Sequence, residues 1–278
     1  MDRRTFIGTT AGVLLTGSGS QVMTSSASRR RLGPIGLQLY TVREQMKADV
    51  AKTLAAVARA GYKEVEFAGY FGHTAGDVRK MLDDNGLVAP SAHVQMGDLG
   101  TGWESTLDYA NKVGHEYLVC AWIDADERTL AGYTKIAARF NEAGRLAREK
   151  GVTLGYHNYS FEFTPVDGQM PYDLLLRECD PQNVVMEIDV FWMRKGGGNP
   201  LQYMERYPGR FPMLHVKDMG PPPANEMMDV GRGIIDWKTL FARGKQGGVH
   251  HVFVEHDETK DPYATMRASF SYLRSLRF

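Results

Sequence analysis

The chain has 278 residues, and its 33 lysines and arginines balance its 33 aspartates and glutamates, so the formal net charge at pH 7 is zero. A neutral chain has no general attraction for phosphate backbones or anionic membranes, which excludes nucleic acid as the expected main partner. Hydrophobic residues make up 43% of the chain, which excludes a disordered protein, and two cysteines are too few for a disulfide framework or a zinc–thiolate site.

The first predicted element is an export signal in residues 1–28. Arg3 and Arg4 form a twin-arginine pair, and a short apolar stretch runs from Phe6 to Leu15. That stretch is too short to anchor the protein across a bilayer, and the arrangement resembles a twin-arginine (Tat) leader. We therefore expect the Tat export machinery as a partner, a periplasmic or secreted location, and no stable membrane span. A basic tail without a targeting role is the alternative.

Residues 29–278 repeat one pattern: a short apolar run, a polar turn, an amphipathic stretch, and often a glycine before the next apolar run. Short apolar runs are typical of strands that are covered on both faces. The runs start 24 to 38 residues apart, which is about the length of one strand with its helix. The eight predicted strands are Ile35–Leu39, Glu64–Phe67, Val88–His93, Tyr117–Trp122, Val152–Tyr156, Val184–Ile188, Met213–Val216 and His251–Glu255.

The segments between these runs have the pattern of helices. In the first, Val50, Leu54 and Val57 recur with the helical period, and the helix is expected to end at Gly61. A glycine just past a helix end supplies the left-handed residue that such ends need. Eight strand–helix units without a linker predict a single-domain α/β fold, the (β/α)8 or TIM barrel. A doubly wound open sheet is the alternative, but no Gly-rich phosphate-binding turn follows the first strand.

Polar side chains gather at the carboxyl ends of the predicted strands, where a barrel carries its chemistry. They are Gln38, Glu66, His93, Asp124, His157, Asn158, Asp189, His215, Lys217 and Glu255. Asp189, His215 and Glu255 follow successive strands about 4.8 Å apart, so the three side chains can converge on one ion. Mixed oxygen and nitrogen ligands suit Mn²⁺, Co²⁺, Zn²⁺ or Mg²⁺. The alternative is a capping aspartate, a core histidine and a glutamate paired with Lys217.

Five motifs in this order resemble the sugar phosphate isomerase/epimerase family of xylose isomerase-like TIM barrels, over about residues 34–278. They are Gly36–Arg43, Gly155–Asn158 with Phe161–Phe163, Asp189–Trp192 with Lys195–Gly197, Pro208–Phe211 leading to His215–Met219, and Val254–Glu258. The resemblance implies a divalent ion held by a strand-five carboxylate together with Asp189, His215 and Glu255. Gly155 stands where many relatives carry that carboxylate, so His157 is the expected fourth ligand and Glu162 a weaker candidate.

The resemblance also implies a metal-dependent sugar isomerase or epimerase that transfers a proton beside a carbonyl, and the leader predicts that this enzyme is exported. We expect Glu255 to act as ligand and base, His157 as ligand or base, and Lys217 as a cation that steadies an oxyanion. The expected substrate is an unphosphorylated sugar or sugar derivative, because sugar phosphates are scarce outside the cytoplasm. The predicted substrate-binding residues are Gln38, Glu66, His93, Trp192 and Lys195.

Two other functions stay open. The same ion and bases suit a lyase that cleaves a 3-keto-glycoside by β-elimination, which would release an aglycone. Loss of the strand-five carboxylate also suits a sugar-binding barrel without catalysis, which would bind its ligand without turnover. Phosphodiester cleavage, as in the endonuclease-IV-like branch of this superfamily, needs more histidine and glutamate ligands and does not fit a neutral chain.

Overall fold

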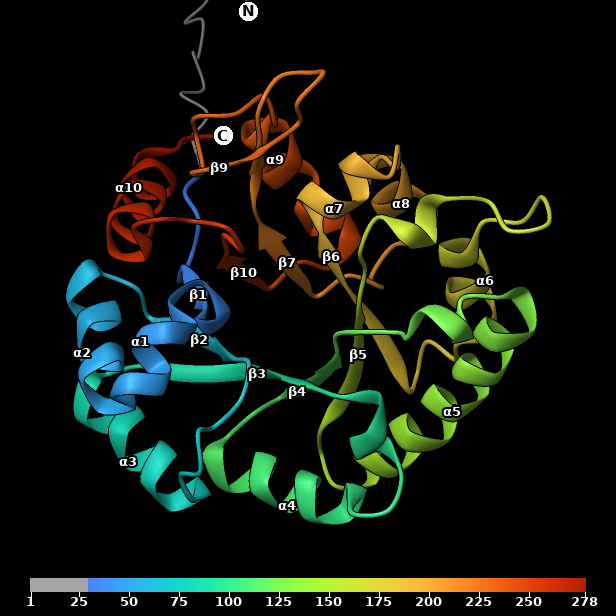
Figure 1. Ribbon diagram of the computed structural model, residues 1–278, viewed down its shortest axis with the longest axis horizontal. Helices are drawn as coiled ribbons and strands as arrows, with labels where there is room; N and C mark the ends of the chain where they lie inside the picture. Colours follow the sequence, from blue (N-terminus) through green and yellow to red (C-terminus); the bar gives the residue numbers. More distant parts are fainter. Residues whose placement is uncertain (1–29) are drawn as a thin grey trace, which may run out of the picture.

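The computed structural model describes residues 30–278, and in it eight parallel strands close into a barrel inside a ring of helices (Figure 1). Each strand pairs with its neighbours in chain order, and the last strand closes the barrel on the first. This confirms the predicted single α/β barrel, whereas the predicted export signal lies outside the described residues. The strands are β1 (Gly36–Gln38), β2 (Glu64–Phe67), β3 (Val88–Val94), β4 (Tyr117–Cys120), β5 (Thr153–His157), β6 (Val184–Asp189), β7 (Met213–Val216) and β10 (His251–Val254).

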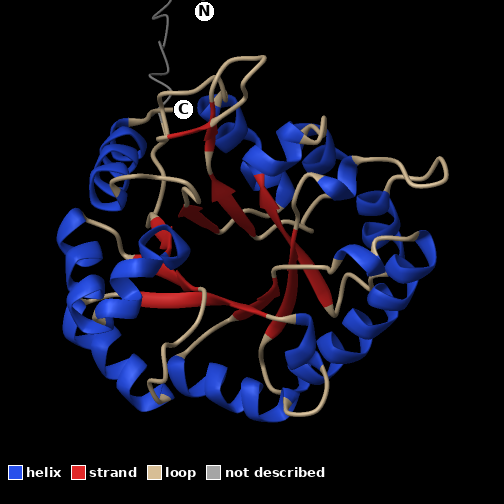
Figure 2. Cartoon of the chain, in the orientation of Figure 1, coloured by secondary structure: helices blue, strands red, loops and turns tan. Residues whose placement is uncertain are grey.

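The helices cover the outer face of the barrel (Figure 2). They are α1 (Arg43–Ala48), α2 (Val50–Ala60), α3 (Ala75–Asn85), α4 (Trp103–Val113), α5 (Leu130–Glu149), α6 (Pro171–Glu178), α7 (Val190–Lys195), α8 (Pro200–Arg206), α9 (Trp237–Gly247) and α10 (Pro262–Ser275). Short 3-10 turns are η1 (Leu39–Val42), η2 (Met96–Leu99), η3 (Ala125–Glu127) and η4 (Phe161–Phe163), and β8 (Asp218–Met219) pairs with β9 (Met227–Met228). No helix of the described part is long and apolar enough to cross a membrane.

Helix α2 shows how the sequence pattern becomes structure. The Asp49 side chain caps its N-terminus, and Val50, Leu54 and Val57 form its buried stripe. The helix ends at Gly61, which has a φ of 110° that favours glycine. The periodicity and the stop signal therefore predicted this helix within one residue at its C-terminus.

An apolar layer fills the barrel interior beneath its carboxyl end. Val119, Met213 and Phe253 are fully buried and pack together in a cluster separate from the main core between sheet and helices. Gly155 belongs to this layer, because a Cβ atom there would lie 3.0 Å from the Val119 side chain. Its strand reaches the mouth two residues later, at His157. On strand five the side chain at the mouth is therefore that of His157, whereas Gly155 lies below it in the apolar layer.

Candidate metal centre

Four buried side chains converge above the apolar layer, and we call them the mouth cluster. His157 ends β5, Asp189 ends β6, His215 lies in β7 and Glu255 directly follows β10. One donor atom of each lies within 4.8 Å of the donor atoms of the others. His157 Nε2 is 3.3 Å from Asp189 Oδ2, and His215 Nδ1 is 2.7 Å from Glu255 Oε2. The structure thus brings the four predicted ligands together.

The donor atoms of the mouth cluster fit a divalent cation. His215 Nδ1 is buried and forms no well-aligned hydrogen bond within the described residues, although it faces the carboxylates of Asp189 and Glu255. The opposite ring nitrogen, Nε2, lies 2.6 Å from Glu66 Oε2. A carboxylate on the far nitrogen is the usual partner of a metal-ligating histidine. Two carboxylates and two imidazoles also form a donor set that suits Zn²⁺ or Mn²⁺.

Helix α7 and the turn after β5 hold Asp189 in place. Its Oδ1 accepts the N–H of Trp192 at 2.8 Å and so caps α7. The amide of Asn158 accepts the Asp189 N–H at 3.1 Å and donates to its carbonyl oxygen at 3.2 Å. Because the cap uses only Oδ1, Oδ2 is free to face the cluster, so the capping role and the ligand role are compatible.

Lys217 is the cation closest to these carboxylates. Its buried Nζ lies 2.9 Å from Asp189 Oδ2, 2.7 Å from Glu255 Oε2 and 2.9 Å from Asp257 Oδ1. Burial lowers the pKa of Lys217, but these carboxylates outweigh burial and raise the pKa well above its usual value. Burial likewise raises the pKa of Glu255, and Lys217 and His215 overcome this effect and hold it below its usual range. Lys217 is therefore charged and Glu255 is a carboxylate at neutral pH.

A cavity of about 340 Å³ opens above the mouth cluster. Tyr40 and Trp122, which are 43% and 41% exposed, form part of its wall and offer aromatic faces to a ligand. The other lining residues are Ala68, His93, Gln95, Ala121, His157, Tyr159, Glu255 and Asp257. Two of the four candidate ligands, His157 and the expected base Glu255, thus line a space large enough for a small sugar.

The predicted substrate-binding residues occupy different surroundings. His93 lines the cavity, whereas Gln38 and Glu66 are fully buried, with Gln38 Nε2 donating to Glu66 Oε2 at 2.7 Å. Lys195 Nζ lies 4.9 Å from the ring centre of Trp192, and neither residue lines the cavity. Substrate contact by these four residues stays a prediction.

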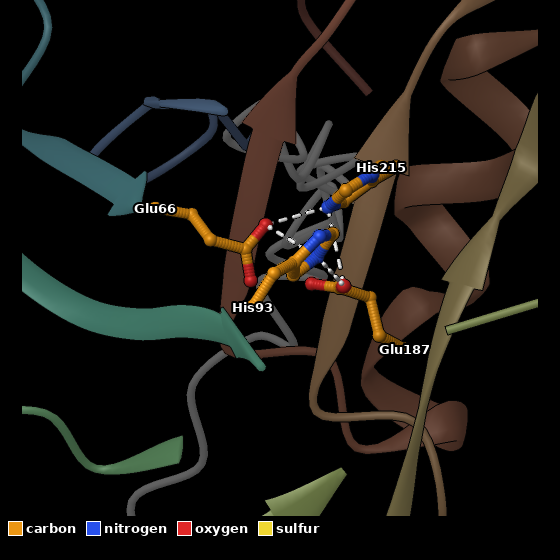
Figure 3. Close-up of side chains that lie close together, drawn as sticks. All are labelled: Glu66, His93, Glu187 and His215. Atoms are coloured by element: carbon orange, nitrogen blue, oxygen red, sulfur yellow. Dashed lines mark hydrogen bonds and ion pairs between the residues drawn. The ribbon is translucent and has the colours of Figure 1, made fainter. Parts of the chain in front are cut away.

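Sequence reasoning missed Glu187, which forms a second buried group with Glu66, His93 and His215 (Figure 3). Glu187 lies inside the predicted strand Val184–Ile188, two residues before Asp189. The sequence carried a signal for a functional role of Glu187, because an isolated charged residue within an apolar strand must face a polar partner.

Glu162, the weaker candidate for the fourth ligand, lies outside the mouth cluster. It is fully buried in η4, where it accepts hydrogen bonds from the Tyr156 hydroxyl and from the Tyr159 N–H. Burial raises the pKa of Glu162 to about 7. Its contacts indicate that it orders the turn after β5.

Comparison with known proteins shows to which family the chain is related. The profile described as "Xylose isomerase-like TIM barrel" matches residues 54–276. An inosose dehydratase of Geobacillus kaustophilus is 23% identical over 218 residues, which cover 69% of this chain and 68% of that protein. The inosose dehydratase of Geobacillus thermodenitrificans is 27% identical over 138 residues. That match covers 44% of this chain and 45% of the relative, so the chain spans less than half of the relative's length. A solved sugar phosphate isomerase/epimerase from Parabacteroides distasonis has a TM-score of 0.76 and 26% identity, covering 91% of this chain and 96% of that one.

Proposed function

Because the chain belongs to the xylose isomerase-like TIM barrel family, we propose that it is a divalent-metal-dependent enzyme that transfers a proton beside the carbonyl of an unphosphorylated sugar or sugar derivative. The observation that carries the proposal is the convergence of His157, Asp189, His215 and Glu255 beside the cavity, whose wall His157 and Glu255 help to form. A divalent ion held there supplies stabilisation for the negative charge that develops on an enediolate oxygen.

The chain's own side chains supply the remaining parts of the reaction. Glu255 is a carboxylate that lines the cavity, so it can take a proton from the carbon beside the carbonyl. Lys217 Nζ, 2.7 Å from Glu255, keeps this carboxylate charged, and its buried charge favours negative charge that develops on a substrate bound in the cavity beside it. Tyr40 and Trp122 can stack on the apolar face of a sugar ring and set its orientation.

Isomerisation or epimerisation is the proposed outcome: the Glu255 carboxyl that has taken the proton returns it to carbon, and His157 would hold the ion as the strand-five ligand. Its Nε2 lies in the mouth cluster and its ring lines the cavity. Burial lowers the pKa of His157, which keeps the imidazole neutral, the form that can ligate a divalent ion.

β-Elimination is the second candidate, and an asymmetry of the site favours it. Glu255 is a carboxylate, whereas the strand-five position carries the imidazole of His157. Reversible proton transfer between two faces is simplest with two similar bases, while elimination needs one base and a different group that assists the leaving group. The relatives named inosose dehydratases favour the same outcome.

Hydrogen exchange tests the proposal directly. Metal-loaded protein is incubated with a panel of unphosphorylated keto-sugars in D2O, and deuterium uptake at carbon is followed by NMR. We expect uptake with wild type, none with Glu255→Gln, and normal uptake with Glu64→Gln, whose carboxylate pairs with His251 instead. Isomerisation conserves the carbon skeleton and its hydroxyls, whereas elimination releases water or an aglycone. Binding of a sugar without exchange or product by the metal-loaded protein would contradict catalysis and identify a binding barrel.

Export through the Tat machinery is a separate proposal, supported by Arg3 and Arg4 and the short apolar stretch behind them. Replacing both arginines by lysine is expected to retain the protein in the cytoplasm, while wild type reaches the periplasm or medium. Equal distribution of the two proteins after cell fractionation would contradict a Tat leader.

A further inference from the structure

A second group of donors lies beside the mouth cluster: His215 Nδ1 faces Asp189 and Glu255, whereas its Nε2 faces Glu66 and Glu187, and Figure 3 shows this second group. Glu66 from β2, His93 from β3 and Glu187 from β6 form it, and we call these three residues the second cluster. His93 Nε2 lies 3.1 Å from Glu187 Oε2 and 3.4 Å from Glu66 Oε2. Glu66 and Glu187 are fully buried, whereas the His93 side chain is 12% exposed and lines the cavity. An ion from solvent can therefore reach this cluster past His93.

The contacts of the two glutamates leave one buried carboxylate oxygen that can ligate a cation. Glu66 is held by Ser91 Oγ at 2.5 Å and by Gln38 Nε2 at 2.7 Å. Glu187 Oε2 lies 3.1 Å from His93 Nε2 and 3.1 Å from His215 Nε2, but its Oε1 is buried without a hydrogen-bond partner among the described residues. Figure 3 shows its carboxylate turned toward Glu66 and His93. An unpartnered buried carboxylate oxygen is strongly unfavourable unless a cation or proton neutralises it.

The negative charges at the mouth of the barrel also favour a second cation. Five carboxylates gather there, and within the described residues Lys217 is the only lysine or arginine that forms an ion pair with any of them. Two divalent ions and one lysine balance five negative charges when the imidazoles are neutral. A single ion leaves two of these negative charges to be balanced by protons on the imidazoles of His93 and His215, which lie against the carboxylates. The carboxylates are Glu66, Glu187, Asp189, Glu255 and Asp257.

We propose that Glu66, His93 and Glu187 bind a second divalent cation beside the ion of the mouth cluster. A neutral imidazole has one acceptor nitrogen and one N–H. His215 therefore ligates the first ion through Nδ1 and donates from Nε2 to Glu66, at 2.6 Å, which couples the two sites. The nitrogen and carboxylate donors suit Zn²⁺ or Mn²⁺. This inference goes beyond the proposed function, because it concerns the number of ions that the protein binds.

Metal stoichiometry tests the second site without an activity assay. The full chain is stripped with a chelator and dialysed to equilibrium against a fixed free concentration of Zn²⁺ or Mn²⁺, and bound metal is measured by mass spectrometry. Glu187→Gln keeps the side-chain shape and removes the charge, and Asp189→Asn does the same in the mouth cluster. Glu64→Gln is the matched control, because Glu64 lies on the same strand as Glu66 but binds His251. Thermal unfolding verifies that each variant is folded.

We expect two ions per chain in wild type and in Glu64→Gln, and one ion in Glu187→Gln. Crystals of wild type soaked in Zn²⁺ are then expected to show an anomalous peak between His93 and Glu187, which settles the matter should Glu187→Gln fail to fold. One ion in wild type, lost with Asp189→Asn and retained with Glu187→Gln, would overturn the second site and leave the proposed function standing. No bound ion in wild type would overturn both.

Discussion

Two buried glutamates at the carboxyl end of the barrel differ in their charge. Glu255 faces the interior, where Lys217 and His215 lie 2.7 Å away and hold its pKa below the usual range despite burial. Glu162 lies in the turn after β5, where its hydrogen-bond partners are Tyr156 and Tyr159, and burial raises its pKa to about 7. Burial is equally complete in the two environments. The charge of the neighbours therefore decides whether a buried carboxylate can serve as base and ligand.

Neutralising Glu255 is expected to have the largest effect. With a keto-sugar that exchanges deuterium in the presence of wild type, Glu255→Gln should lower the exchange rate by at least about 100-fold, because it removes the base. Glu162→Gln, which neutralises the other glutamate, should retain most of the activity. Equal losses in the two variants, measured by NMR on metal-loaded protein, would erase the functional distinction between the two sites.

Replacing Lys217, whose ammonium group lies beside Glu255, tests why that carboxylate stays charged. Lys217→Met leaves Asp189, Glu255 and Asp257 without their shared partner. Deleting one partner of a buried ion pair costs about 3–5 kcal/mol, so the free energy of unfolding of the metal-free variant should fall by that amount. A divalent ion should recover more stability in the variant than in wild type, because it restores the lost positive charge. Urea unfolding with chelator and with Zn²⁺ measures both effects, and unchanged metal-free stability would contradict the account.

The raised pKa of Glu162 predicts a pH-dependent difference between wild type and Glu162→Gln. Folded wild type holds this proton up to about pH 7, whereas the unfolded chain releases it near the ordinary pKa of 4.5. The folded state thus binds more protons in this window, so this residue's contribution to stability falls as pH rises from 4.5 to 7. The stability of Glu162→Gln relative to wild type should increase by up to about 3 kcal/mol across the window. Denaturant unfolding at both ends of the window measures the change, and a constant difference would show that no charge is suppressed at Glu162.

The smallest expected effect concerns the support of Asp189. Asn158→Ala removes both hydrogen bonds between the Asn158 side chain and the Asp189 backbone. Loss of such outer contacts lowers metal affinity by about 10-fold or more. Competition with a fluorescent zinc chelator measures the affinity, and Asn183→Ala, whose amide bonds to Asp180, is the control with no expected change. Unchanged affinity in Asn158→Ala would mean that α7 alone positions Asp189.

The sequence predicted the barrel because each unit carries its own local signals, such as the apolar stripe of α2 and its stop at Gly61. It also located Asp189, His215 and Glu255, because a polar residue at the end of an apolar run marks the mouth. Depth within the barrel was harder to predict, since it depends on the stagger between strands. The sequence therefore did not show that Gly155 lies in the apolar layer against Val119, two residues below the mouth.

Glu187 shows a second limit of prediction from sequence, which concerns the residues that a buried charge contacts. A strand of a parallel barrel is buried on both faces, so the apolar run around Glu187 does not reveal which side chains point inward. The inward direction follows only once Asp189 is taken to point inward, because side chains two residues apart on a strand lie on the same face. Its partners Glu66 and His93 lie 121 and 94 residues earlier in the chain, beyond the reach of any local pattern.

Anomalous diffraction from crystals grown with Zn²⁺ or Mn²⁺ tests the central claim most directly. The account predicts a strong peak within bonding distance of His157 Nε2, Asp189 Oδ2, His215 Nδ1 and Glu255 Oε2, and its absence in crystals of Asp189→Asn. Wild-type crystals with no peak among these four atoms, at metal concentrations that saturate the protein in solution, would contradict a metal centre at the mouth of the barrel.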